Sequence, residues 1–176
     1  MRLFHRTSFV IAAVAVTAAV GISVAAAVSG AATTADEQPS TVEDFGYPGA
    51  AAILAADHVQ LISGDGHILY KTCPPTEAPG LIIVRTSDTI GPGARGRICF
   101  QVTGPVGHLT LKVPNVFAVR GDGTSGGQGH KLKASLSTDA GMHTTVDVNP
   151  NADTEVGIAA TPPGDPTTLL QLDAAS

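Results

Sequence analysis

Short apolar runs separated by turn-forming residues constrain the fold of this chain more than any other feature. From residue 59 onward these runs are strand-sized, and Gly, Pro, Asn or Asp residues bound them. Most of them alternate apolar and polar side chains, which is typical of antiparallel strands with one buried face and one face in water. The predicted strands are 59–63, 67–73, 81–86, 98–103, 109–113, 116–120, 131–137, 144–148, 156–160 and 168–172.

This pattern predicts an all-β fold, either an antiparallel β-sandwich or a jelly roll. Residues 50–57 are rich in good helix formers and predict one short helix near the start of the mature domain. The sequence Gly64-Asp65-Gly66 predicts a hairpin turn between the first two strands. No repeat of solenoid or propeller length is visible, so we expect neither architecture.

The N-terminus has the layout of a secretory signal peptide. Arg2 and Arg6 precede an uncharged apolar stretch, residues 9–28, and small residues follow it. A small-x-small cleavage site at 29–31 predicts a signal peptide over 1–31. The alternative is an uncleaved membrane anchor through 9–28, because about 20 apolar residues are long enough to span a bilayer.

The remaining chain divides into two predicted parts. Residues 32–45 are polar and acidic with one proline, which predicts a flexible linker. Residues 46–176 contain the strand-sized runs and form the predicted β-sandwich domain. We therefore expect a secreted, extracellular protein with no stable membrane span after cleavage.

The charge of the chain argues against nucleic acid as a partner. The sequence has 10 basic and 15 acidic residues, and loss of Arg2 and Arg6 with the signal peptide changes the formal net charge from −5 to −7. Such an excess of negative charge repels phosphate backbones. Aromatic residues make up only 4% and Trp is absent, which also weakens the case for a sugar-binding surface. An unknown extracellular ligand or a cell-envelope component is the expected partner.

Cys73 and Cys99 are the only cysteines. In an exported chain an even number of cysteines favours a disulfide. There is no C-x-x-C motif and no histidine at metal-ligand spacing, so a redox pair or a metal ligand pair is less favoured.

Several segments resemble known secreted proteins. The residues YPGA (47–50), ISGDGHI (62–68), CFQVTGPVGHLTLKVP (99–114) and TTLLQL (167–172), with the cysteine pair, are similar to uncharacterised secreted β-sandwich proteins of filamentous actinobacteria. Residues 100–113 also resemble the start of bacterial pre-peptidase C-terminal domains, which are β-sandwich modules appended to secreted hydrolases. No protease domain precedes this segment, and that family lacks this cysteine pair. The resemblance implies an exported β-sandwich and carries over no catalytic residue.

The glycine-rich segment 121–129 is predicted as a ligand-binding loop. Its candidate contact residues are Asp122, Thr124, Ser125 and Gln128. Residues 123–127 also match the G-x-S-x-G motif of hydrolases, but that motif needs a helix after its serine, and a strand is predicted here. We therefore assign no catalytic residue to this loop.

Oxygen-bearing side chains fall at every second position from residue 147 to residue 155, and such an alternation can wrap Ca²⁺. Ala152 and Ile158 stand where an EF-hand loop has its glycine and its bidentate glutamate, and an ordinary turn is the alternative. No other cofactor is expected. The five candidate calcium ligands are Asp147, Asn149, Asn151, Asp153 and Glu155.

These observations favour a secreted, non-enzymatic β-sandwich protein that acts as a binding or cell-surface-associated module. The alternatives are a small exported hydrolase and an accessory protein or inhibitor of secreted hydrolases. The five histidines after the signal peptide lack zinc-ligand spacing. A Ser-His-Asp arrangement built from distant residues stays open, because such triads are spatial.

Overall fold

The computed structural model describes residues 45–76, 79–124 and 127–176. The chain separates into two units, Met1–Thr41 and Val42–Ser176, and every described residue belongs to the second. The predicted signal peptide, the alternative anchor and the predicted linker up to residue 44 lie outside the described residues. Within the described ranges no helix is long and apolar enough to cross a membrane.

The predicted helix is confirmed as α1 (Ala50–Asp57), the one α-helix of the described residues. It starts after Gly49, whose φ is 73°, and stops at His58, whose φ is 57°. Both angles are left-handed and turn the chain at the two ends of the helix. Every residue before Asp57 is apolar, yet none is fully buried, and Leu54 is 46% exposed.

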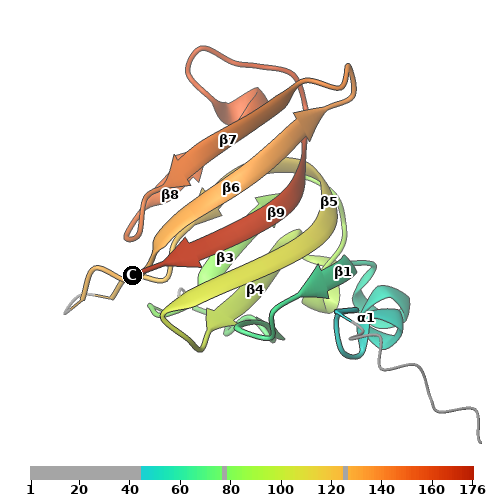
Figure 1. The fold of residues 1–176 in the computed structure, drawn as a ribbon. Helices are drawn as coiled ribbons and strands as arrows, with labels where there is room; N and C mark the ends of the chain where they lie inside the picture. The colour runs from blue at the N-terminus through green and yellow to red at the C-terminus, as the bar shows by residue number, and fades with distance from the viewer. Residues whose placement is uncertain (1–44, 77–78, 125–126) are drawn as a thin grey trace, which may run out of the picture. The chain divides into compact units, whose positions relative to one another are not determined.

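The all-β fold is confirmed, and every strand pairing is antiparallel (Figure 1). The strands are β1 (Gln60–Gly64), β2 (Ile68–Lys71), β3 (Ile82–Thr86), β4 (Arg97–Val102), β5 (Val106–Arg120), β6 (Lys131–Thr138), β7 (His143–Val148), β8 (Asp153–Glu155) and β9 (Thr167–Ala175), with short 3-10 turns η1 (Pro92–Ala94) and η2 (Gly157–Ala159).

Two of the predicted strand boundaries are wrong. The runs 109–113 and 116–120 belong to one strand, β5, because Asn115 takes a left-handed φ of 51° and forms a bulge instead of a turn. The predicted strand 156–160 is largely the turn η2, because Gly157 has a φ of 55° and leaves the extended conformation. The only strand near it is β8, which lies inside the segment predicted as a cation loop.

The long strand β5 organises the topology. The sheet order is β2-β4-β3-β5-β9-β6-β7, and β1 and β8 also pair with β5. The first part of β5 lies between β1 and β9, and its last part lies between β3 and β8. In Figure 1, β3 and β4 lie behind β9 and β5. The hydrogen-bonding pattern is therefore one continuous sheet, in which β5 joins one group of strands, β2, β4 and β3, to a second group, β9, β6 and β7. The sandwich or jelly-roll architecture stays a prediction.

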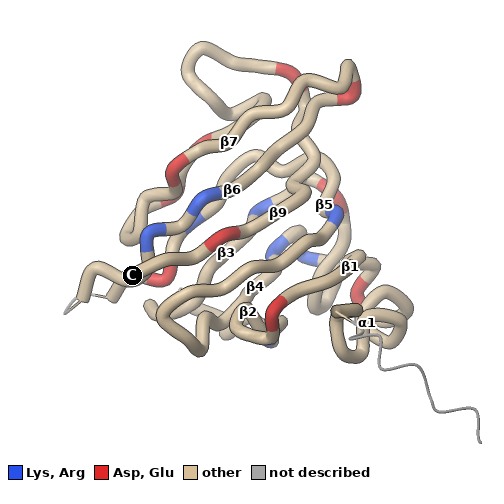
Figure 2. The backbone as a smooth tube through the Cα atoms, viewed as in Figure 1, with Lys and Arg blue, Asp and Glu red and all other residues tan. Residues whose placement is uncertain are grey.

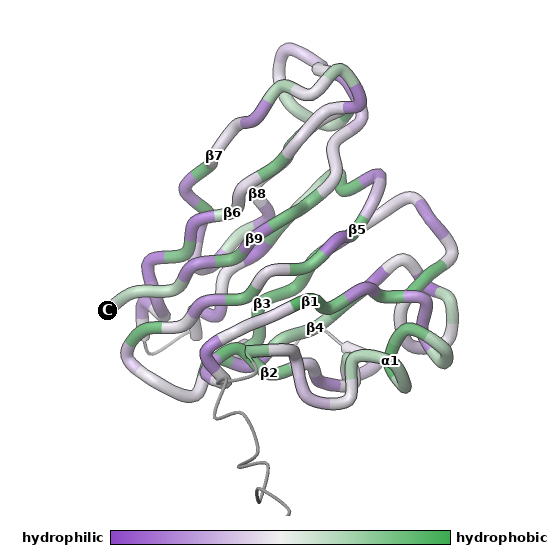
Figure 3. Tube along the Cα trace, turned by 45° about the vertical axis from the view of Figure 1, so that its right-hand side comes forward, coloured by the Kyte–Doolittle hydropathy of each residue, from purple (hydrophilic) through white to green (hydrophobic). Residues whose placement is uncertain are grey.

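One apolar core is shared by both groups of strands. Alternate residues of β6 (Leu132, Ala134 and Leu136) are buried, as their spacing predicts. Phe100 of β4 is fully buried in the same cluster. In Figure 3 hydrophobic and hydrophilic segments alternate along several of the strands. Replacing a buried phenylalanine with alanine lowers the free energy of unfolding by about 3–5 kcal/mol in other protein cores.

The predicted disulfide between Cys73 and Cys99 is confirmed, with the two Cα atoms 5.3 Å apart. It ties the chain just after β2 to the buried strand β4. A disulfide of this kind is compatible with an extracellular protein.

Candidate functional site

The two loops singled out in the sequence lie against each other. The Gly121 N–H donates to the Asn149 carbonyl at 3.0 Å, and the Gly123 N–H donates to the Pro150 carbonyl at 2.8 Å. The Arg120 guanidinium donates to the Asn151 carbonyl at 2.8 Å. Residues 121–123 and 149–151 therefore lie side by side, although β6 and β7 separate them in the sequence.

A buried carboxylate closes the first of these loops. Asp122 is only 7% exposed. Its Oδ1 accepts the His130 backbone N–H at 2.8 Å, and its Oδ2 lies 2.6 Å from His130 Nδ1. The other ring nitrogen, Nε2, lies 3.0 Å from the Gly104 carbonyl oxygen. Both partners of the ring are acceptors, so the geometry engages both nitrogens of His130 within the protein.

Gly129 allows this closure. Its φ is +69°, and a Cβ there would lie 2.6 Å from the Gly123 nitrogen and 2.7 Å from Asp122 Oδ1. Both the backbone conformation and the space therefore require glycine.

A hollow of about 580 Å³ opens beside the closed loop. We call it the lysine-lined hollow, and its size falls within the range of ligand pockets. Residues 128–130 and Pro150 supply its walls together with residues of β6 and β7. The polar and charged residues that line it include Gln128, His130, Lys131, Lys133 and Asp147.

Two cations face this hollow in a protein whose net charge is negative. Lys131 Nζ donates to the Ser176 carbonyl at 2.9 Å. Lys133 Nζ lies 3.4 Å from Asp147 Oδ1, and these side chains are 61% and 87% exposed. An exposed pair of this kind is weak, at about 0–1 kcal/mol, so the lysine remains available to a stronger anion. In Figure 2 the basic segments of β6 lie beside the C-terminal end of the chain.

The four residues predicted as ligand contacts of the glycine-rich loop do not share one position in the structure. Gln128 lines the lysine-lined hollow. Asp122 is buried and holds the loop closed. Thr124 pairs with Gly127 through two backbone hydrogen bonds of 2.9 and 3.1 Å and does not line the hollow. Ser125 lies outside the described residues. As expected, the strand β6 follows this loop, not the helix that a hydrolase elbow requires.

The candidate calcium ligands are spread over a strand, a turn and another strand. Asn149 Oδ1 accepts two backbone N–H groups, from Asn151 at 2.9 Å and Ala152 at 3.1 Å. Asp153 pairs with Arg85 at 3.1 Å, and Asp147 pairs with Lys133. Glu155 lies on β8. Among the described residues no three His, Cys, Asp or Glu side chains gather as a metal-ligand set. The calcium loop stays a prediction.

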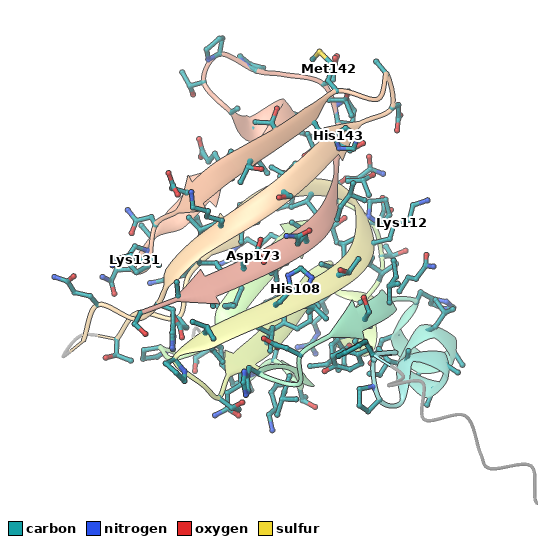
Figure 4. The ribbon with its side chains drawn as sticks, viewed as in Figure 1. His108, Lys112, Lys131, Met142, His143 and Asp173 are labelled. Carbon is teal, nitrogen blue, oxygen red and sulfur yellow. A yellow bond between two sulfur atoms is a disulfide. The ribbon has the colours of Figure 1, made fainter. Side chains whose placement is uncertain are left out.

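A second polar network lies on the outer face of β5 and β9. His108 Nδ1 lies 2.7 Å from Asp173 Oδ1, and His108 Nε2 lies 3.3 Å from Thr110 Oγ1 (Figure 4). Gln171 donates to the other oxygen of Asp173 at 2.6 Å. The order hydroxyl, imidazole, carboxylate matches that of a hydrolase relay.

This network lacks the other half of such a site. β5 is paired on both sides at Thr110, with Ser63 of β1 and Gln171 of β9. The backbone at Thr110 is therefore paired within the sheet, and the His108 N–H donates to Asp65 Oδ2 at 2.9 Å, so these groups are not presented as an oxyanion hole. His108 and Asp173 are a direct cross-strand pair, which fits a role in fixing the strand register.

The two tyrosines of the sequence, Tyr47 and Tyr70, line a hollow of about 230 Å³ beside α1. The Tyr70 backbone N–H donates to the Tyr47 hydroxyl at 2.6 Å, and the Tyr70 hydroxyl donates to Asp57 at 2.7 Å. Burial and the bond to Asp57 raise the pKa of the Tyr70 phenol above its ordinary value. Both hydroxyls are thus engaged within the protein.

Sequence reasoning did not single out His130, Lys131 and Lys133. The available signal was the alternation of residues 131–137, which places Lys131 and Lys133 on one face of β6 directly after the glycine-rich loop. No protein-family model matches the chain, and no curated protein is significantly similar to it.

Proposed function

We propose that this protein is an exported, non-enzymatic binding module whose ligand places an anionic group in the lysine-lined hollow. The observation that carries the proposal is the presence of Lys131 and Lys133 in a hollow of about 580 Å³ bounded by two loops. In a protein with a formal net charge of −5, two lysines in one concave surface favour a local anion.

The closed loop supports binding over catalysis. Both ring nitrogens of His130 lie within hydrogen-bond distance of an acceptor of the protein itself, Asp122 or Gly104, so both are engaged before a ligand arrives. Asp122 and His130 also fix the two ends of this loop to each other, which lowers the entropic cost of binding. The signal peptide predicted over 1–31 and the disulfide support an extracellular location.

Within this proposal, the ligand is an extracellular anionic polymer, with the cell envelope as its source. Repeated carboxylate or phosphate groups would engage both lysines at once, while Gln128 supplies a hydrogen bond from the loop. The binding is electrostatic at an exposed surface and therefore weakens as the salt concentration rises.

A sedimentation assay tests the proposal. The purified protein is mixed with insoluble bacterial cell-envelope material, chitin or cellulose, and the bound fraction is measured across protein concentrations. We expect saturable binding to envelope material alone, and competition by polyglutamate or polyphosphate tells a carboxylate ligand from a phosphate ligand.

The chain offers a matched control. The variant Lys131→Gln/Lys133→Gln removes two charges from the hollow, and Lys71→Gln/Lys112→Gln removes two charges from exposed positions outside it. We expect the first pair to weaken envelope binding about fivefold or more and the second to bind as the parent does. Equal losses in both variants would assign the binding to net charge and contradict the hollow as the site.

A further inference from the structure

A second cavity lies at the other end of the β6–β7 hairpin. It has a volume of about 320 Å³ and lies between the β6–β7 turn and residues 155–167. Its apolar walls include Leu136, Met142, Val146 and Val156, and we call it the apolar cleft. In Figure 4, Met142 and Lys131 lie at opposite ends of this hairpin. Lys131 and Thr138, at the two ends of β6, are roughly 23 Å apart by the rise of a strand.

One wall of the apolar cleft is held in place before any ligand binds. Gly157 has a φ of +55°, and a Cβ there would lie 2.8 Å from Thr167 Oγ1. The Gly157 carbonyl accepts the N–H groups of Ala160 at 3.2 Å and Gly164 at 2.9 Å. Thr167 Oγ1 in turn donates to the Val116 carbonyl at 2.9 Å, so this wall is fixed to β5. A preformed cavity loses little entropy on binding.

The opposite wall is adaptable. Met142 is 61% exposed, although large apolar side chains are usually covered. Its thioether is unbranched and flexible, and such side chains fit ligands of varied shape. An exposed methionine beside an apolar cavity is therefore suited to closing over an apolar ligand.

The charges of the apolar cleft are all of one sign. Among the described residues that line it, Glu155 and Asp165 carry the only charges, and both are acidic. An apolar ligand with a carboxylate would be repelled by this pair, whereas a cationic head would be attracted.

We propose that the apolar cleft binds a small amphipathic cation, with its hydrocarbon part between Met142 and Val156 and its ammonium group beside Glu155 and Asp165. This site has the opposite charge preference to the lysine-lined hollow and does not depend on the function proposed there.

Three probes with the same chain and different heads test this inference: octyltrimethylammonium, octanol and octanoate. The sequence contains only two methionines, so a protein labelled with ¹³C at the methionine methyl groups gives a direct signal from Met142. We expect octyltrimethylammonium to shift the Met142 signal saturably and to bind roughly fivefold or more tightly than octanoate. Equal or tighter binding of octanoate, or no Met142 shift with any probe, would overturn the proposal.

Two charge-matched variants identify the acidic residues responsible. Glu155→Gln/Asp165→Asn should reduce the affinity for octyltrimethylammonium to about that for octanol, while Asp88→Asn/Asp173→Asn, whose two positions lie outside the cleft, should leave it unchanged. A thermal melt of each variant confirms that it folds. A folded Glu155→Gln/Asp165→Asn variant that keeps the parent's affinity would reject the assigned cation contact.

Discussion

Asp122 holds both the backbone N–H and the imidazole of His130, with contacts of 2.8 and 2.6 Å. The two residues bracket the glycine-rich segment, so a single buried carboxylate closes the loop at both of its ends. The same imidazole reaches the Gly104 carbonyl and thereby links this loop to the turn between β4 and β5.

Asp122→Asn should lower the free energy of unfolding by about 1–3 kcal/mol. The two contacts use different oxygens of Asp122, and an Asn side chain has an NH2 group in place of one of them, so it cannot reproduce both contacts with His130. Urea unfolding measures the loss, and Asp88→Asn is a suitable control because Asp88 accepts an exposed side-chain hydrogen bond from Asn115. A midpoint equal to that of the parent would contradict the closing role of Asp122.

Gly129→Ala should destabilise the fold more than Gly141→Ala does. Both glycines have left-handed φ angles, +69° and +83°, so both substitutions carry a similar backbone cost of about 1 kcal/mol. Only at Gly129 would the new Cβ meet other atoms closely, whereas nothing lies within 4 Å at Gly141. Thermal melts of the two variants give the difference, and equal melting temperatures would show that the loop relaxes around the methyl group.

The Cys73–Cys99 pair should resist alkylation until a reductant is added. Intact mass after alkylation is expected to show no added label without reductant and two labels after reduction and unfolding; two labels without reductant would disprove the bridge. The sequence separation of 26 residues predicts a loss of roughly 3–4 kcal/mol in the Cys73→Ser/Cys99→Ser variant on the chain-entropy account. Guanidinium unfolding of the two proteins measures that loss.

Asp65 should make stability depend on pH in the acidic range. Burial opposes ionisation of this carboxylate, but the backbone N–H groups of His67 and His108, each 2.9 Å away, outweigh it and lower the pKa of Asp65 below 3.8. A lowered pKa in the folded state means a contribution that is present above the ordinary pKa and is lost as the pH falls through the lowered one.

The comparison with Asp65→Asn isolates this contribution. The parent should be the more stable protein at pH 6, and the gap between the two should shrink as the pH falls below about 3.8. Urea midpoints across this range test the expectation. A gap that stays constant with pH would mean that the geometry of the turn matters, not the charge.

Removal of calcium should leave the melting temperature unchanged. Asn149 already accepts two backbone hydrogen bonds, and Asp147 and Asp153 are each paired with a cation, so calcium coordination by these side chains would have to break four existing interactions. A melt in EDTA beside one in calcium chloride tests this expectation. A higher melting temperature with calcium would restore the alternating oxygen ligands as a metal site.

The strand pattern was predictable wherever alternation is local. Leu132, Ala134 and Leu136 repeat with a period of two, and all three face the core. The continuity of β5 was not predictable in this way, because Pro114 and Asn115 have the composition of a turn. In the folded protein they form a bulge within a strand, the place where a sheet tolerates proline.

The two loops of the candidate site were predictable separately, but the contact between them was not. Residues 121–129 and 147–155 were selected for their own turn chemistry, whereas their contact depends on the β6–β7 pairing and on backbone bonds such as Gly121 to Asn149. Asp122 illustrates the same limit. A carboxylate in a glycine-rich loop suggests an exposed ligand contact, and only the folded structure pairs it with His130.

The shared strand β5 also determines how this protein unfolds. Because β5 hydrogen-bonds to β1, β9, β3 and β8, neither group of strands can open without disturbing a strand that belongs to the other. Unfolding should therefore be a single cooperative event for both groups. The amide protons of β5 should exchange with solvent deuterium only through global unfolding, and those of the edge strand β7 should exchange through local fraying.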